Sequence, residues 1–220
     1  MDRTQCWYKD VCPVTVDECL GNYCVRLEEM RFLVSHSGLP ENKWFPQSLS
    51  ADDVDYDAYC KLAEIKDNIV DFVQSGANLY IYSKTTGNGK TTWAIKLLLK
   101  YFDQIWAGNG FRPRGLFISV PMFLTQLKNF DNKSLELERV KDELPKVDLV
   151  VWDDVASTNM SNYDHSQLIS YIDQRVLAGK SNIYTSNMGI NDIIKPLGIR
   201  LASRIWNNSV QIEFRGGDKR

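Results

Sequence analysis

Between residues 78 and 214 the chain alternates short apolar runs with longer stretches of helical apolar spacing, and this alternation limits its possible folds most strongly. Strands that are apolar on both sides and separated by helices form parallel sheets that are covered on both faces. The sequence therefore predicts an α/β fold with a parallel five-stranded sheet between helices. The predicted strands are 78–83, 114–120, 147–154, 181–187 and 210–214, and the predicted helices are 90–106, 121–130, 163–179 and 197–208.

The N-terminal part of the chain does not follow this alternation. Residues 1–40 form a small cysteine-rich region, and residues 41–58 are rich in Pro, Ser and Asp, which predicts a linker. We expect the α/β domain to span 59–220, with its last residues, 215–220, disordered.

Two further helices are predicted in front of the first strand. The first, at 23–35, has helical apolar spacing, and the second, at 59–76, is amphipathic and ends at Gly76. This second helix places Cys60 in the core.

Composition excludes several classes of protein. No run of about 18 apolar residues occurs, so we expect neither a membrane span nor a signal peptide, and a cytoplasmic location. The formal net charge is −2, so a nucleic acid would have to bind at a local basic patch. Candidate residues for such a patch are Arg112, Arg114, Lys128 and Lys133, near Phe111, Phe123 and Phe130, although helical spacing favours the core for these phenylalanines.

A candidate phosphate-binding loop lies between the first strand and its helix, in the run SKTTGNGKTT. The usual spacing is Gly, four residues, then Gly-Lys-Ser/Thr, and Lys84 stands at the position of the first glycine. Gly87 and Gly89 still allow the backbone N–H groups to turn toward phosphates, and the helix N-terminus adds partial positive charge. We therefore expect a working loop, with the Lys84 side chain in solvent. A glycine-rich turn that binds nothing is the weaker interpretation.

Within this loop the motif assigns a role to each polar group. Lys90 would reach the β and γ phosphates, and Thr91 would coordinate Mg²⁺. The expected nucleotide-binding residues are Gly87, Asn88, Gly89, Lys90, Thr91, Thr92 and Asp153.

Two acidic residues end the third predicted strand, in LVVWDD. Ligands of open α/β sheets bind at the carboxyl ends of the strands, so Asp153 would help Thr91 to hold the metal, and Asp154 would orient the attacking water. The next strand ends in Asn187, whose amide is a candidate to orient that water or to contact the γ-phosphate. On a later helix Arg200 and Arg204 lie four residues apart, on one face.

GNGKTT, LVVWDD, IYTSN and RLASR occur in the order found in AAA+ ATPases, and residues 75–215 resemble the DnaC/DnaI-type helicase loaders of bacteria and phages. The resemblance implies a P-loop AAA+ domain without a C-terminal helical lid. It also implies ATP and Mg²⁺ as cofactors. By motif position, it assigns Asp154 and Asn187 to catalysis, and it makes Arg204 an arginine finger, which contacts the ATP of a neighbouring subunit. Arg200 is the second candidate for this finger.

The partners that the resemblance implies are a DnaB-type replicative helicase, single-stranded DNA and, with ATP, further copies of the chain, all inside a bacterial host cell. Relatives often carry glutamate at the position of Asp154, and aspartate is one methylene shorter, so we expect slow ATP hydrolysis. Lys84 and Asp154 are the two departures from the broader AAA+ pattern.

Four of the five cysteines fall in the first 24 residues. Cys6, Cys12, Cys19 and Cys24 are separated by five, six and four residues, and four thiolates would bind Zn²⁺ tetrahedrally. The spacings lack paired C-x2-C motifs, so free thiols and an iron–sulfur cluster remain alternatives. The resemblance implies that this region contacts the helicase.

Three other functions compete with the loader. A transposition helper ATPase shares the AAA+ motifs but would bind duplex DNA and a transposase, and the cysteine-rich region favours the loader. A small P-loop kinase would need a substrate lid and no arginine finger. A binding module with a vestigial ATP site is the third, because of Lys84.

Overall fold

The computed structural model describes residues 6, 8, 12, 19, 24–44, 49, 53–107, 110–128, 134–156 and 160–218. Within them lies one parallel sheet of five strands in the order β2-β3-β4-β1-β5. The predicted parallel sheet and its strands are thereby confirmed. The strands are β1 (Asn78–Tyr82), β2 (Gly115–Ser119), β3 (Leu149–Asp153), β4 (Ser181–Ser186) and β5 (Ser209–Glu213).

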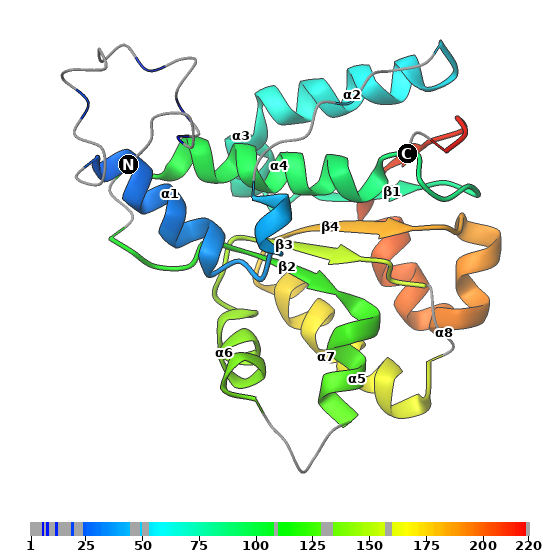
Figure 1. Cartoon of the computed structure of the whole chain (residues 1–220). Coiled ribbons are helices and arrows are strands. Elements are labelled where there is room, and N and C mark those ends of the chain that lie inside the picture. Colours follow the sequence, from blue (N-terminus) through cyan, green and yellow to red (C-terminus); the bar gives the residue numbers. More distant parts are fainter. Residues whose placement is uncertain are drawn as a thin grey trace.

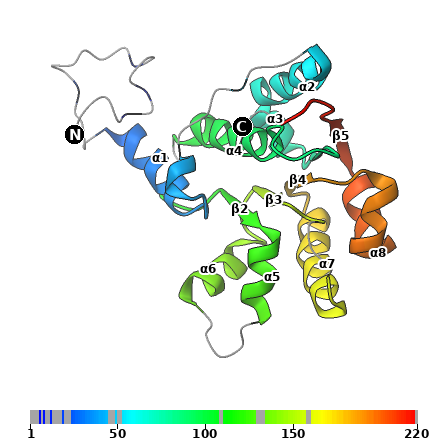
Figure 2. The same cartoon turned by 45° about the vertical axis from the view of Figure 1, so that its right-hand side comes forward.

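Helices cover the sheet on both faces, as Figures 1 and 2 show. One layer contains α1 (Val25–Ser35), α2 (Tyr56–Asp67), α3 (Ile69–Gln74) and α4 (Lys90–Ile105). The opposite layer contains α5 (Val120–Lys128), α6 (Leu135–Glu143), α7 (Asn162–Leu177) and α8 (Ile190–Asn207). No helix among these described residues is both long and apolar enough to cross a membrane.

Alternating side chains of each strand enter two different cores. In β1, Leu79 and Ile81 pack toward α4, whereas Tyr80 packs toward α8. In β3, Val151 joins the first core and Trp152 the second. Since successive side chains of a strand point to opposite faces, both faces must be apolar, which explains the continuous apolar runs of the sequence.

The helical layers differ from the sequence prediction in three places. The helix predicted at 59–76 is two helices, which meet at Asn68. The core position of Cys60 was wrong, because α2 buries other residues of its first turns and leaves the thiol exposed. Residues 135–143 form α6, which was not predicted, and α8 begins at Ile190 and is kinked where Gly198 has a φ of 70°.

The described part of the cysteine-rich region packs on the α/β domain. Arg26 of α1 forms an ion pair with Asp103 of α4, with 2.8 Å between the guanidinium and the carboxylate. After α1, the Ser37 carbonyl accepts a hydrogen bond of 2.7 Å from the Phe117 N–H on the edge strand β2. The division into regions 1–40, 41–58 and 59–220 stays a prediction.

Arg175 of α7 connects the segment before β3 to the start of β4. Its side chain is fully buried, and desolvation lowers its pKa to about 10. The guanidinium donates to the carbonyls of Leu144 and Val147, at 2.6 and 2.9 Å, and to that of Ser181 at 2.7 Å. One side chain therefore satisfies the backbone before β3 and at the start of β4.

We expect Arg175→Met to lower the free energy of unfolding by about 4 kcal/mol, because several buried carbonyls lose their donor together. In a domain of this size that corresponds to a thermal midpoint roughly 10 °C lower. The control is Lys141→Ala, which removes a partly exposed pair with Glu138 and should change the midpoint by about 2 °C or less. Thermal melts followed by circular dichroism measure the midpoints. Equal midpoints for the two variants would show that the hydrogen bonds of Arg175 do not stabilise the fold.

Candidate active site

The predicted site residues of the loop and the strand ends lie at one edge of the sheet. β1 pairs with β4, and β4 pairs with β3, all in parallel, so the segments that follow these strands leave the same edge. The Ser83 N–H donates to the Ser186 carbonyl at 3.2 Å, and the Val155 N–H donates to the Thr185 carbonyl at 3.0 Å. These bonds bring the start of the loop, the two aspartates and the end of β4 together.

The loop has the backbone that its glycines permit. Gly87 and Gly89 have φ values of 74° and 98°, which other residues rarely adopt, and Gly89 is the residue that precedes α4. The side chain of Asn88, within the loop, is buried and donates hydrogen bonds to the hydroxyls of Ser83 and Thr85. The Lys84 side chain is exposed, as predicted for the departure from the motif.

Lys90 reaches back into the loop from the first position of α4. Its ammonium donates to the Thr85 carbonyl at 3.0 Å and to the Asn88 side-chain oxygen at 3.1 Å, and the side chain is 6% exposed. A buried cation held among loop carbonyls is positioned for an anionic ligand, because phosphate oxygens would complete its hydrogen bonds. Thr92 lies two residues further along α4, within its first turn, and is partly buried.

Thr91, at the start of α4, and Asp153, at the end of β3, are joined by a hydrogen bond. The Thr91 hydroxyl donates to Asp153 Oδ1 at 2.8 Å, and the Thr185 hydroxyl of β4 donates to the same oxygen at 2.6 Å. Desolvation raises the pKa of Asp153, while these two hydrogen bonds oppose the rise. Hydroxyl and carboxylate oxygens are the ligands that Mg²⁺ prefers, and a cation would offset the desolvation of the carboxylate. The residues therefore fit Mg²⁺ beside a bound phosphate.

Asp154 directly follows β3 and has an unusual backbone conformation. It has a φ of 57°, which is uncommon for a residue other than glycine, and its N–H donates to Thr185 Oγ1 at 3.0 Å. Thr185 thus fixes both aspartates, through the carboxylate of one and the backbone of the other. Strained backbone of this kind persists where the surroundings hold it.

The C-terminal residues pack against the loop, so the prediction that all of 215–220 are disordered was wrong for 215–218. Asp55 is buried, and its carboxylate accepts hydrogen bonds from the N–H groups of Arg215 at 2.7 Å and Gly216 at 3.1 Å. The Gly216 carbonyl accepts a hydrogen bond of 2.9 Å from Thr85 of the loop. The exposed carboxylate of Asp218 lies over Gly87, where a Cβ would displace it, and it is the positive φ of Gly87 that favours glycine here.

Asp55→Ala is expected to release this tail and to lower the free energy of unfolding by about 2 kcal/mol, since two N–H groups lose a charged acceptor. Hydrogen exchange should show faster exchange at the amides of Arg215 and Gly216. Asp53→Ala is the matched control, because Asp53 is exposed in the same short helix, η4 (Asp53–Asp55). If the two variants left these amides equally protected, the proposed anchoring by Asp55 would be wrong.

The remaining predicted site residues differ in their positions. Asn187 directly follows β4 and is partly buried at the same edge. Arg200 and Arg204 lie on α8, where both pair with Asp173 of α7, at 3.6 and 2.9 Å. Their side chains are 71% and 50% exposed, so they are accessible to a neighbouring molecule.

Sequence reasoning missed Thr185, Asp173 and Asp55. A signal existed for Thr185, because a polar side chain in a doubly buried strand needs a buried partner. Nothing comparable marked Asp55, whose partners are backbone groups about 160 residues away along the chain.

The described residues include all five cysteines, and all are free thiols. Among the described residues, no three His, Cys, Asp or Glu side chains lie close enough together to hold a metal ion between them, as a zinc site of protein ligands alone would require. Most of the chain between Cys6 and Cys24 lies outside these ranges, so zinc binding by Cys6, Cys12, Cys19 and Cys24 stays a prediction.

Two residues of the candidate basic patch are already engaged in ion pairs. Arg114 pairs with Asp148, and Lys128 pairs with the buried Asp164 at 2.7 Å. Phe123 is buried, in agreement with its helical spacing. The structure leaves Arg112 and Phe111 exposed, while Phe130 and Lys133 lie outside the described residues.

Solved structures show the same fold in proteins of DNA replication. The DnaC helicase loader superposes with a TM-score of 0.65 at 17% identity, covering 80% of this chain and 100% of that chain. DnaI superposes with a TM-score of 0.65 at 20% identity, covering 86% and 100%. DnaA from Aquifex aeolicus bound to AMPPCP gives 0.58 at 18% identity, covering 76% of this chain and 48% of that one. No protein-family model and no curated protein sequence matches. The predicted α/β fold of AAA+ domains is thereby confirmed.

Proposed function

We propose that the chain is a slow, Mg²⁺-dependent ATPase of the AAA+ class that delivers a DnaB-type replicative helicase onto single-stranded DNA in a bacterial cell. The observation that carries the ATPase part is the hydrogen-bonded set Thr91–Asp153–Thr185 directly beneath the loop that holds Lys90. It unites a phosphate-binding loop with oxygen ligands for Mg²⁺, as ATP hydrolysis requires.

Each residue has a defined part in this proposal. Lys90 and the loop N–H groups bind the β and γ phosphates, and Thr91 with Asp153 holds Mg²⁺. Asp154 and Asn187 orient the attacking water. Because the aspartate is short and its backbone is fixed by Thr185, we expect slow hydrolysis.

Arg204, with Arg200 beside it, would act on the ATP of a neighbouring copy. Both guanidiniums are largely exposed and share one acidic partner, Asp173. That carboxylate, on the neighbouring α7, holds both side chains at the surface, where we expect a second copy to meet them. ATP-dependent self-association is therefore part of the proposed function.

The loader role has separate support. The chain has the fold of DnaC and DnaI over most of its length and over the whole of those chains. DnaC is a helicase loader, and the DnaA structure contains an ATP analogue. We therefore favour the helicase as the partner over a transposase.

We test the partner by mixing the purified chain with the DnaB-type helicase of the same cell and separating complexes by size-exclusion chromatography. A stable complex whose amount depends on ATP is expected. No complex with or without ATP, while the chain still binds an ATP analogue, would refute the loader role and leave the ATPase.

The cysteine-rich region is proposed to bind one Zn²⁺ per chain through Cys6, Cys12, Cys19 and Cys24. Elemental analysis of protein purified without chelators should find about one equivalent of zinc. Cys12→Ser with Cys19→Ser should lose it, whereas Cys60→Ser, which removes a thiol outside the region, should retain it. Zinc retained in the double variant, or iron in its place, would contradict this site.

A further inference from the structure

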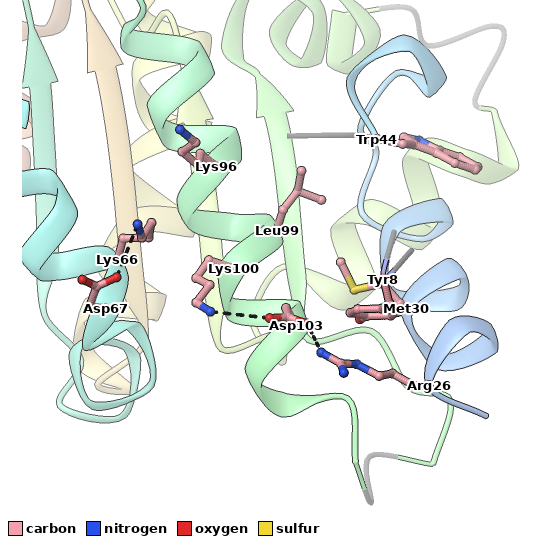
Figure 3. A pocket seen from close by; sticks show the side chains of 10 residues that line it. All are labelled: Tyr8, Arg26, Met30, Trp44, Lys66, Asp67, Lys96, Leu99, Lys100 and Asp103. Atoms are coloured by element: carbon pink, nitrogen blue, oxygen red, sulfur yellow. Dashed lines mark hydrogen bonds and ion pairs between the residues drawn. The ribbon is translucent and has the colours of Figure 1, made fainter. Parts of the chain in front are cut away.

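A groove separate from the loop runs along α4 between α1 and α2, shown in Figure 3. Its volume of about 390 Å³ lies within the range of ligand sites. Side chains from three helices and from two segments near α1 line it: Tyr8, Arg26, Met30, Trp44, Lys66, Asp67, Lys96, Leu99, Lys100 and Asp103.

The groove carries an excess of positive charge. Its lining contains four cations and two carboxylates. Asp103 forms ion pairs with two of the cations: Arg26 lies 2.8 Å and Lys100 lies 3.5 Å from its carboxylate oxygens. Among the residues that the structure describes, Lys66 pairs with the exposed Asp67, at 3.3 Å. The described lining therefore carries a net charge of two positive units.

One of these two net charges lies where α2 faces α4, and the other lies with Arg26 and Lys100 around Asp103. Lys96 forms no ion pair with any residue that the structure describes, and its ammonium lies 4.9 Å from the ring centre of Trp93. Desolvation and the charge of Lys66 both lower the pKa of Lys96. Two lysines that repel one another across a groove are stabilised by an anion between them.

The opposite side of the groove is apolar. Met30 of α1 and Leu99 of α4 are 4% and 3% exposed, and both line the groove. Tyr8 lies on the same side, but the guanidinium of Arg26 covers its ring, 3.6 Å from the ring centre. Trp44, which is partly exposed, also lines the groove and adds aromatic surface to these aliphatic side chains.

We propose that this groove binds an acidic segment of a partner protein, which places an apolar side chain against the side formed by Met30, Leu99 and Trp44 and carboxylates at Lys66 and Lys96. Charge complementarity selects an anionic segment, and the apolar lining selects an apolar side chain beside the acids. Single-stranded nucleic acid fits less well, because its binding proteins stack successive bases on several aromatic rings, whereas the described lining has two, and Arg26 covers that of Tyr8. This site goes beyond the proposed ATPase and lies apart from its residues.

The test uses a short fluorescein-labelled peptide in which glutamates flank a leucine, with binding followed by fluorescence anisotropy at low salt. A peptide with glutamines in place of the glutamates and a labelled oligothymidylate are the comparison probes. Lys96→Glu should weaken binding of the acidic peptide by about tenfold or more, because attraction becomes repulsion. Lys96→Gln, the milder change, should weaken it by about threefold.

Lys61→Glu is the matched control, since Lys61 is exposed on α2 outside the groove and the charge change is the same. It should weaken binding by less than about twofold. Equal losses in Lys61→Glu and Lys96→Glu, or equal binding of the glutamine peptide, would overturn the proposal. A third result would also overturn it: Lys96→Glu removes binding of oligothymidylate but leaves binding of the acidic peptide unchanged. The groove would then be a nucleic-acid site. None of these measurements contains ATP, so their outcome is independent of the ATPase.

Discussion

Lys90→Ala is expected to abolish ATP binding, with affinity reduced by about 100-fold or more, because a buried charge-assisted contact to two phosphates is lost. The ammonium is 6% exposed and held in the loop by Thr85 and Asn88. Binding of a fluorescent ATP analogue measures the effect directly.

The matched control removes a lysine from the same loop. Lys84 is exposed, so Lys84→Ala and Lys84→Gly should leave affinity within about threefold of the unaltered chain. Thermal melts establish that Lys90→Ala is folded. Undiminished affinity in folded Lys90→Ala would place the nucleotide elsewhere, and a large loss in Lys84→Gly would show that Lys84 itself contacts nucleotide.

Arg204→Ala is expected to reduce ATP hydrolysis by up to roughly 10³-fold while ATP binding survives. The reason is geometric: Arg204 pairs with Asp173 on the surface of α8 and lies outside the hydrogen-bonded set of its own loop. Steady-state phosphate release and binding of the ATP analogue separate the two effects. Lys195→Ala, which removes an exposed cation from the same helix, should leave both unchanged.

Mixing two inactive variants decides whether Arg204 acts between subunits. Arg204→Ala chains keep an intact loop, and Lys90→Ala chains keep an intact arginine. A mixture should regain hydrolysis wherever a Lys90→Ala chain presents its Arg204 to the ATP that is bound to an Arg204→Ala chain. A mixture that co-assembles but stays as inactive as either variant alone would contradict the role in trans, and Arg204 would then only pair with Asp173.

The sequence predicted the fold because each strand is buried on both faces. A run such as Leu149–Asp153, in which every residue is buried, has few alternatives to a central parallel strand. The kink of α8 at Gly198 was missed because Leu197 and Leu201 on its two sides continue the same apolar face, although Pro196 and Gly198 are residues that interrupt helices. Unlike the strands, α6 is mostly charged, so apolar spacing gave little sign of it.

For the site, local motifs predicted what lies close in sequence and missed what the tertiary structure joins. Lys90, Thr91 and Asp153 follow from the loop and the strand end, and the hydrogen bond between Thr91 and Asp153 agrees with their proposed shared role. Asp55 reaches the tail across the fold, and Asp173 meets Arg204 from another helix. Such pairs depend on packing that no local pattern encodes.

The central claim is that ATP bound at this loop allows the chain to place a helicase on single-stranded DNA. The direct measurement is strand displacement on a circular single-stranded template coated with single-strand-binding protein, using the DnaB-type helicase of the same cell. The account predicts that the chain with ATP accelerates unwinding by about tenfold or more, since a closed ring cannot thread onto a circle, and that Lys90→Ala does not. Unwinding that is unchanged by the chain, or that is equally accelerated by folded Lys90→Ala, would contradict it.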